Sequence, residues 1–235
     1  MSSGCPASKK FQVLCLHGHA QTAEAFRGRI GSIRSPLKKW CDFHFLDGPF
    51  EVPPCAHSAE PARSWMQVSP DTAPNVDPKT VFESWQTSLE FIDRIIAEKQ
   101  IDALLGFSLG AAMSLGVMLN DIATVSRGTN EGPETASSRY KFVALFAGFI
   151  PFKNPELEHI LRAKLREVGS SRLPPSFHCY GMDDHIILAE HSEEVATFFP
   201  DACVFTHPGG HLVPSQAKNP LRDFVQLLSE KSQAP

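Results

Sequence analysis

A serine stands between two glycines in the stretch Gly106-Phe107-Ser108-Leu109-Gly110. The apolar run ALLGF ends directly before the serine, and small residues (GAA) follow Leu109. This pattern is typical of a sharp strand-to-helix turn that presents a serine hydroxyl, where larger residues in place of the glycines would collide with the neighbouring strand and helix. Because five residues alone are a weak signal, the strand-turn-helix context is what predicts that Ser108 is a nucleophile.

A serine hydroxyl attacks well only when a base removes its proton and a third group orients that base. The chain has ten histidines, and His211 follows Pro208-Gly209-Gly210 just after the last apolar run of strand length. The two glycines allow a tight loop that turns the imidazole back toward the end of the strand. We therefore predict that His211 is the base, and we interpret most of the other histidines as residues of polar turns.

The acid that orients the base is expected between the serine and the histidine, at the end of the preceding strand. The apolar run FHCYG leads into Asp183 and Asp184, so both aspartates are candidates. The resulting order of serine, aspartate and histidine is that of the α/β-hydrolases, and differs from the orders in chymotrypsin and subtilisin. The agreement of three separately placed features makes this the strongest signal in the chain.

Acyl transfer also needs two backbone N–H groups that bind the negative oxygen of the intermediate. We assign one to Leu109, directly after the nucleophile, and the other to His19, in the loop after the first strand, where Gly18 permits a close backbone approach. A metal pair formed by His17 and His19 is the alternative. No carboxylate lies nearby in the sequence to complete such a site, and Cys15 stands inside the apolar run of the strand, where a thiol is usually buried. We therefore expect neither a metal nor an organic cofactor.

Apolar runs of strand length alternate with amphipathic stretches of helix length, which favours a mostly parallel sheet of about six strands covered by helices on both faces. Thr80 with Glu83 predicts a capping box at the start of the clearest helix, and Asn154 predicts another helix start. The predicted strands are 11–16, 42–46, 101–107, 142–146, 177–180 and 203–206. The predicted helices are 22–40 in two pieces, 80–99, 109–119, 155–168, 190–199 and 221–229.

Two segments break this alternation. Residues 47–79 contain seven prolines and are interpreted as an irregular lid over the site. Its apolar residues are candidate walls of a substrate pocket, with a core position as the alternative for the tryptophan: Phe50, Trp65, Met66 and Val68. Residues 126–139 are polar and are interpreted as a flexible surface insertion.

The composition excludes several classes of protein. The 235 residues are 42% hydrophobic and 20% charged, and the three widely spaced site residues require one sheet, so a single domain over residues 1–235 is expected. The net charge of −4 gives no positive field for nucleic acid. The absence of a long apolar run and of an N-terminal signal pattern predicts a cytoplasmic protein without a membrane span. Six cysteines without zinc or redox spacing predict neither a disulfide framework nor a metal site.

The sequence also resembles the fungal-type family of serine hydrolases within the α/β-hydrolases. The resemblance runs from the first strand to the last loop and rests on these stretches: LCLHGHAQT, DGPFEVP, RSW, LLGFSLGAA, YGMDDHII and GGHLVP. It implies that Ser108 is the nucleophile and His211 the base, and its Gly-x-x-Asp spacing after Gly181 selects Asp184 over Asp183. The family often has an apolar residue such as Phe at the position of His19 and Gln at that of Leu109, so this chain departs from it beside the expected oxyanion hole.

The resemblance implies a thioesterase that releases a polyketide acyl chain from a carrier protein in fungal secondary metabolism. A free-standing carboxylesterase for small lipophilic esters is the alternative, and a catalytically silent fold used for binding is a third. The stretch from Arg27 to Lys39 carries five basic residues and no acidic one. It could dock an acidic carrier protein that presents a thioester, or simply form a solvated helix face.

Overall fold

The computed structural model describes residues 9–53, 62–67, 76–128, 138–151 and 153–232, with the backbone alone for residues 124–128. Six parallel strands form a central sheet in the order β2-β1-β5-β6-β7-β8. Their bounds are Phe11–Leu16 (β1), Cys41–Leu46 (β2), Ala103–Phe107 (β5), Phe142–Phe146 (β6), Ser176–Gly181 (β7) and Cys203–His207 (β8). The α/β fold predicted from the alternation is thereby confirmed.

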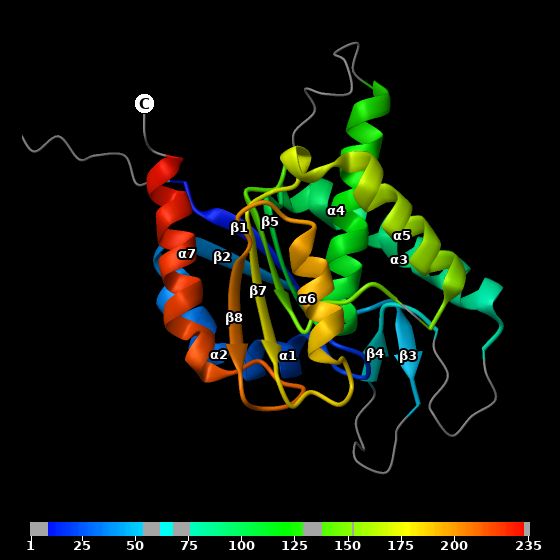
Figure 1. Cartoon of the computed structure of the whole chain (residues 1–235), viewed down its shortest axis with the longest axis horizontal. Helices are drawn as coiled ribbons and strands as arrows, with labels where there is room; N and C mark the ends of the chain where they lie inside the picture. Colours follow the sequence, from blue (N-terminus) through cyan, green and yellow to red (C-terminus); the bar gives the residue numbers. More distant parts are fainter. Residues whose placement is uncertain (1–8, 54–61, 68–75, 129–137, 152, 233–235) are drawn as a thin grey trace, which may run out of the picture.

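Helices cover both faces of this sheet (Figure 1). One layer is formed by α1 (Ala23–Arg29), α2 (Gly31–Arg34), the short 3₁₀ helix η1 (Ser35–Lys39) and α7 (Lys218–Lys231). The other contains α3 (Pro78–Lys99), α4 (Leu109–Gly128), α5 (Pro155–Val168) and α6 (Ala189–Thr197). Two further 3₁₀ turns are η2 (Ser170–Arg172) and η3 (Ser215–Ala217). Because both faces are covered, the middle strands β5 and β6 are buried throughout and are apolar without alternation.

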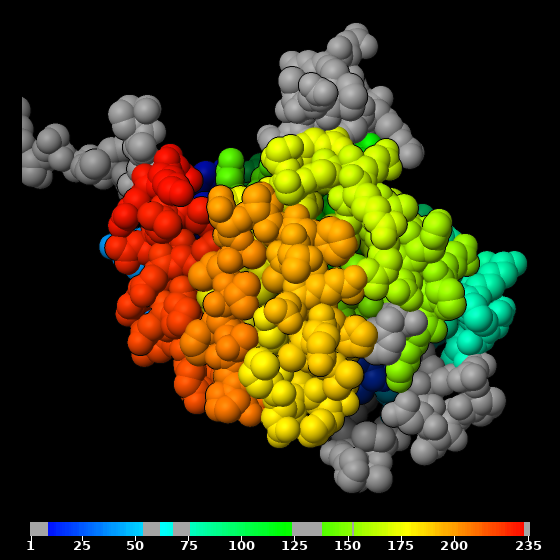
Figure 2. All heavy atoms as spheres, viewed as in Figure 1, coloured from blue at the N-terminus to red at the C-terminus, as the bar shows by residue number. Residues whose placement is uncertain are grey.

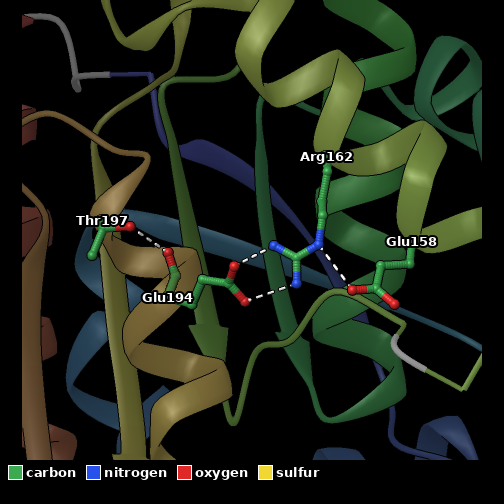
Figure 3. Close-up of polar contacts among 4 residues, drawn as sticks. All are labelled: Glu158, Arg162, Glu194 and Thr197. Carbon is green, nitrogen blue, oxygen red and sulfur yellow. Dashed lines mark hydrogen bonds and ion pairs between the residues drawn. The ribbon is translucent and has the colours of Figure 1, made fainter. Parts of the chain in front are cut away.

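An ion pair joins two helices of the second layer (Figure 3). Arg162 of α5 donates to both carboxylate oxygens of Glu194 in α6, and its Nε donates to Glu158 one turn earlier at 2.9 Å. The bidentate geometry matches the planar guanidinium to the carboxylate. Helix α6 follows the loop that carries Asp184, so this contact also fixes the element behind that loop.

The structure corrects the predicted bounds of several helices, and the differences in α3 and α4 bear on named predictions. Helix α3 begins at Pro78, and the Asp77 carboxylate caps it by accepting from the N–H of Lys79, so the capping box of Thr80 and Glu83 is wrong. Proline at the first helical position is favourable because its missing N–H would have no partner there. Helix α4 continues to Gly128, so residues 126–128 belong to the helix and not to an insertion. Residues 129–137 of that predicted insertion lie outside the described residues.

The proline-rich segment contains regular structure that the prediction omitted. Strands β3 (Phe50–Val52) and β4 (Ala62–Ser64) pair antiparallel into a small second sheet. The prediction that residues 47–79 hold no regular element is therefore wrong. The remaining parts of that segment, 54–61 and 68–75, lie outside the described residues, and so does Val68. Among the described helices, none combines the length and the apolar character needed to cross a bilayer.

Candidate active site

Ser108 lies on a strained turn between β5 and α4. Its φ angle of +55° is in the left-handed region that side chains other than glycine rarely adopt. The turn is held because the Ser108 N–H donates to the carbonyl of Phe146 at 2.8 Å. A Cβ at Gly110 would collide with the carbonyls of Leu16 and His17, and one at Gly106 would collide with the start of α4. The two glycines are thus required by close packing, as the sequence predicted.

The turn is placed where ligands bind in sheets of this kind. From β1 the chain continues to β2 at one edge of the sheet, whereas from β5 it continues to β6 on the opposite side. The direction in which successive strands are added therefore reverses between β1 and β5. Crevices form at the carboxyl ends of strands at such a reversal. Ser108 follows β5 and the loop of His17 to Ala20 follows β1, so both lie at this point. The loops after β7 and β8 reach the same edge of the sheet (Figure 1).

Three of the predicted side chains form one line of hydrogen bonds. The distance from Ser108 Oγ to His211 Nε2 is 2.9 Å, and that from His211 Nδ1 to Asp184 Oδ2 is 2.7 Å. The Asp184 side chain is 1% exposed, while that of His211 keeps 14% of its surface. A buried carboxylate therefore faces one ring nitrogen, and a hydroxyl faces the other. This arrangement can remove a proton from the serine and stabilise the imidazolium that results.

The two aspartates considered from sequence are separated clearly. Asp184 Oδ1 accepts from the N–H groups of Ile186 and Ile187 at 2.9 and 3.0 Å, which fixes the carboxylate. The Asp183 side chain is 72% exposed and contacts only His185, at 3.3 Å, among the described residues. The structure thus brings Asp184 to His211 and leaves Asp183 in solvent.

The loops after β7 and β8 lie side by side and hold His211 in place (Figure 2, yellow and orange). The N–H of Met182 donates to the backbone carbonyl of His207 at 2.8 Å, and the N–H of Asp183 donates to the backbone carbonyl of Gly209 at 3.3 Å. A Cβ at Gly181 would collide with the backbone of residues 209 and 210, so a glycine is needed for this approach. The His211 ring itself lies 4.8 Å from the Phe107 ring, centroid to centroid. Its orientation is therefore set by packing as well as by hydrogen bonds.

Two backbone N–H groups near the site have no hydrogen-bond partner within the described residues. They belong to His19, in the loop after β1, and to Leu109, the first residue of α4. A free N–H at the start of a helix also carries the positive end of the helix dipole. Both groups are suited to bind an anionic oxygen, which is the role predicted for them.

His17 has a part in the site that the sequence did not indicate. Its imidazole is fully buried, with Nδ1 2.7 Å from the carbonyl of Gly18 and Nε2 3.0 Å from the N–H of Gly48. Because Nε2 accepts from Gly48, the ring is neutral and protonated at Nδ1. Burial lowers the pKa of His17, which favours this neutral form. The ring anchors the loop after β1, and no group of three or more metal-binding side chains occurs in the described part of the chain.

The predicted pocket walls occupy different environments. Trp65 is completely buried, and its indole N–H donates to the carbonyl of His17 at 2.8 Å, so it belongs to the core. Met66 is also buried, and Phe50 of β3 is half-buried. Trp65 therefore supports the same loop as the His17 ring. Of the three predicted walls that the structure describes, only Phe50 keeps partly exposed surface for contact with a bound molecule.

Comparisons with known proteins identify a family of serine hydrolases. The family model described as "Serine hydrolase (FSH1)" matches residues 7–221. An Aedes aegypti protein named an esterase is 31% identical over 99% of this chain and 81% of its own length, and the mouse esterase OVCA2 is 29% identical over 90% and 92%. A Schizosaccharomyces pombe protein named dihydrofolate reductase is 32% identical over 93% of this chain, which spans only 47% of that relative.

Solved structures show the same fold at low identity. Zea mays acyl-protein thioesterase 2 aligns with a TM-score of 0.64 at 14% identity, covering 95% of this chain and 96% of its own. Arabidopsis thaliana SOBER1 aligns with a TM-score of 0.59 at 20% identity, covering 94% and 99%. These structures are α/β-hydrolases, and the architecture of this chain is theirs.

Proposed function

The chain belongs to the FSH1 family of serine hydrolases, and we propose that it cleaves acyl esters or thioesters with Ser108, His211 and Asp184. The observation that supports these roles best is the continuous line of hydrogen bonds from Ser108 Oγ through the His211 ring to Asp184. A strained turn, a base and a buried acid meet at the edge where the loops after β1 and β5 also meet. No cofactor is required for this chemistry.

The reaction we propose has two steps. His211 Nε2 takes the proton of Ser108 as Ser108 Oγ attacks the acyl carbon. The bond from the acyl carbon to the alcohol or thiol then breaks, and His211 returns the proton to that leaving group. In the second step His211 takes a proton from water, the water oxygen attacks the acyl-serine, and Ser108 recovers its proton as the carboxylic acid departs. Asp184 holds the ring and stabilises its charged form in both steps.

We assign stabilisation of the intermediate to the N–H groups of His19 and Leu109. Each tetrahedral intermediate places a negative charge on the former carbonyl oxygen, and two preset N–H donors stabilise it without reorganisation. Removing one such donor typically lowers kcat by about 100- to 1000-fold. These two N–H groups are free of other partners within the described residues, which supports the assignment.

A lipophilic acyl group is the substrate that the surroundings favour. Six large apolar side chains are exposed in the described part of the chain, and four of them belong to the segments after β7 and β8 that carry Asp184 and His211. These four are Met182, Ile186, Leu188 and Leu212. Exposed apolar surface concentrated beside a reactive site is typical of a binding site for apolar ligands.

We propose that the preferred substrate is a polyketide thioester on a carrier protein. The basic stretch Arg27 to Lys39 supports a carrier partner, because Arg27, Arg29 and Lys38 are exposed. Arg27 and the half-buried Arg34 also lie over the Phe45 ring of the edge strand β2. The second candidate is a free-standing carboxylesterase for lipophilic esters, which the relatives named esterases favour.

Matched substrates test this function. Hydrolysis of an acyl thioester, its oxygen ester and the same acyl group on a carrier protein is measured with wild-type protein and with the double variant Arg29→Glu, Lys38→Glu. A carrier-dependent thioesterase turns over the thioester faster, and the double variant raises KM only for the carrier-bound form. Preference for the oxygen ester supports the carboxylesterase. Absence of turnover for every substrate by folded protein contradicts both enzyme functions.

A further inference from the structure

The hairpin of β3 and β4 is joined to the loop after β1 at several points. Gln21 and Arg63 exchange two backbone hydrogen bonds, of 3.3 and 2.8 Å. Gly48, just before β3, donates to the His17 ring, and a Cβ at Gly48 would collide with the carbonyl of Ser64. These contacts place the end of β4 directly against the loop that holds the His19 N–H.

One side-chain contact completes this junction. Ser64 is 1% exposed, and its hydroxyl donates to the carbonyl of Met66 at 2.8 Å. Because that proton is used, Ser64 Oγ accepts from Nδ1 of His19, 3.0 Å away. Partial desolvation lowers the pKa of His19, so the neutral ring carries its proton on Nδ1. Within the described residues, this is the one hydrogen bond of the His19 ring.

We propose that Ser64 is a positioning residue for the oxyanion hole. The hydroxyl holds the imidazole of His19, and the imidazole in turn sets the place of the His19 N–H. An error of a few tenths of an ångström at such a donor weakens a hydrogen bond that matters most in the transition state. The inference rests on the proposed function, because it gives Ser64 a role only if the His19 N–H binds the oxyanion.

A double-mutant cycle tests whether Ser64 acts through His19. Ser64→Cys keeps the side-chain volume but replaces the oxygen with a weak acceptor, and His19→Phe keeps a ring and the backbone N–H but removes the hydrogen bond. We expect each single variant to lower kcat about fivefold, the effect of one neutral hydrogen bond, with KM changed less than twofold. The double variant is expected to be no slower than either single variant.

A second readout separates positioning from general damage to the fold. A trifluoromethyl ketone forms an adduct with the nucleophile whose oxyanion occupies the hole, so its affinity should fall by the same factor as kcat in each variant. The matched control is Ser176→Cys, since Ser176 is also a buried serine bonded to a histidine ring, His178 at 3.0 Å, but lies at the opposite end of β7. That variant should keep wild-type kcat and inhibitor affinity.

Each result decides a separate point. Effects that multiply in the double variant, or a change confined to KM, would overturn the proposed role of Ser64. Equal losses of kcat in Ser176→Cys would do the same, because they would show that any damaged buried serine has this effect. The proposed function is tested independently by Ser108→Ala, which must lose turnover whatever Ser64 does.

Discussion

Three serine–histidine hydrogen bonds of nearly equal length occur among the described residues, and two of them have opposite surroundings. Ser108 and His211 are 2.9 Å apart at the carboxyl edge of the sheet, and Ser176 and His178 are 3.0 Å apart at the start of β7. The first pair has a buried carboxylate on its second ring nitrogen, a strained turn under the serine and partial exposure. The second pair has no carboxylate within the described residues, regular strand geometry and complete burial. A short Ser–His contact is therefore insufficient by itself, and the surroundings determine what it can do.

Removing the serine hydroxyl should separate the two pairs most strongly. Ser108→Ala takes away the atom that we propose attacks the acyl carbon, so kcat should fall about a millionfold, the loss typical of a nucleophilic serine. Ser176→Ala should stay within about twofold of wild type. Steady-state ester hydrolysis measures both. Turnover that persists in Ser108→Ala, after contaminating activity is excluded with an active-site titrant, would place the nucleophile elsewhere.

Neutralising the acid should give the next largest effect. Asp184→Asn removes the negative charge beside His211 Nδ1 and allows the wrong ring tautomer, so kcat should fall about 10⁴-fold. Asp183→Asn is the matched control, because this neighbouring aspartate is exposed and contacts only His185 in the described part of the chain. Its kcat should change less than twofold. The reverse ranking of the two variants would show that Asp183 is the acid.

The Ser176–His178 pair should affect the free energy of unfolding at acidic pH and leave the rate of hydrolysis unchanged. Complete burial lowers the pKa of His178 to about 4, whereas an unfolded chain binds that proton near pH 6.5. Because the unfolded state binds more protons between these values, the free energy of unfolding falls as pH drops from 6.5 to 4, by up to about 3 kcal/mol from this residue.

The matched variant for this effect is His178→Phe, which keeps a ring against Phe199 but has no titrating group. Urea unfolding at pH 7, 5.5 and 4.5 should show a smaller loss of stability in this variant than in wild type. The buried imidazole of His17 remains in both proteins, so part of the acid sensitivity persists. If His178→Phe loses stability with falling pH as strongly as wild type, His178 does not contribute to the acid sensitivity. If folded His178→Phe no longer hydrolyses esters at pH 7, the purely structural role of His178 is contradicted.

Features that depend on local residues could be predicted from the sequence. The glycines around Ser108, the Gly-Gly pair before His211 and the aspartates after β7 all follow apolar runs, and strand ends of a parallel sheet meet at one edge. The bounds of β1, β6 and α5 were predicted to the residue, because strong burial and clear helix ends define them. The selection of Asp184 came from the family resemblance, since spacing alone left both aspartates open.

Features that depend on contacts between distant residues could not be predicted. Strands β3 and β4 have three residues each, too few to show a periodic pattern, and they lie in a proline-rich segment. The cap of α3 belongs to Asp77 because Pro78 can begin a helix, a local choice that the pattern of Thr80 and Glu83 obscured. The hydrogen bond from His19 to Ser64 joins positions 45 residues apart. Both positions lie in stretches that resemble the family, LCLHGHAQT and RSW, but neither stretch indicates that the two side chains meet.

Labelling with a fluorophosphonate tests the central assignment most directly, because the reagent reacts with a serine only when a base and an oxyanion hole activate it. Folded wild-type protein is treated with the reagent, and the modified peptide is identified by mass spectrometry. We predict one modification, on Ser108, that is absent from folded Ser108→Ala and unchanged in Ser176→Ala. Folded protein that stays unlabelled, or is labelled at another serine, would contradict the account.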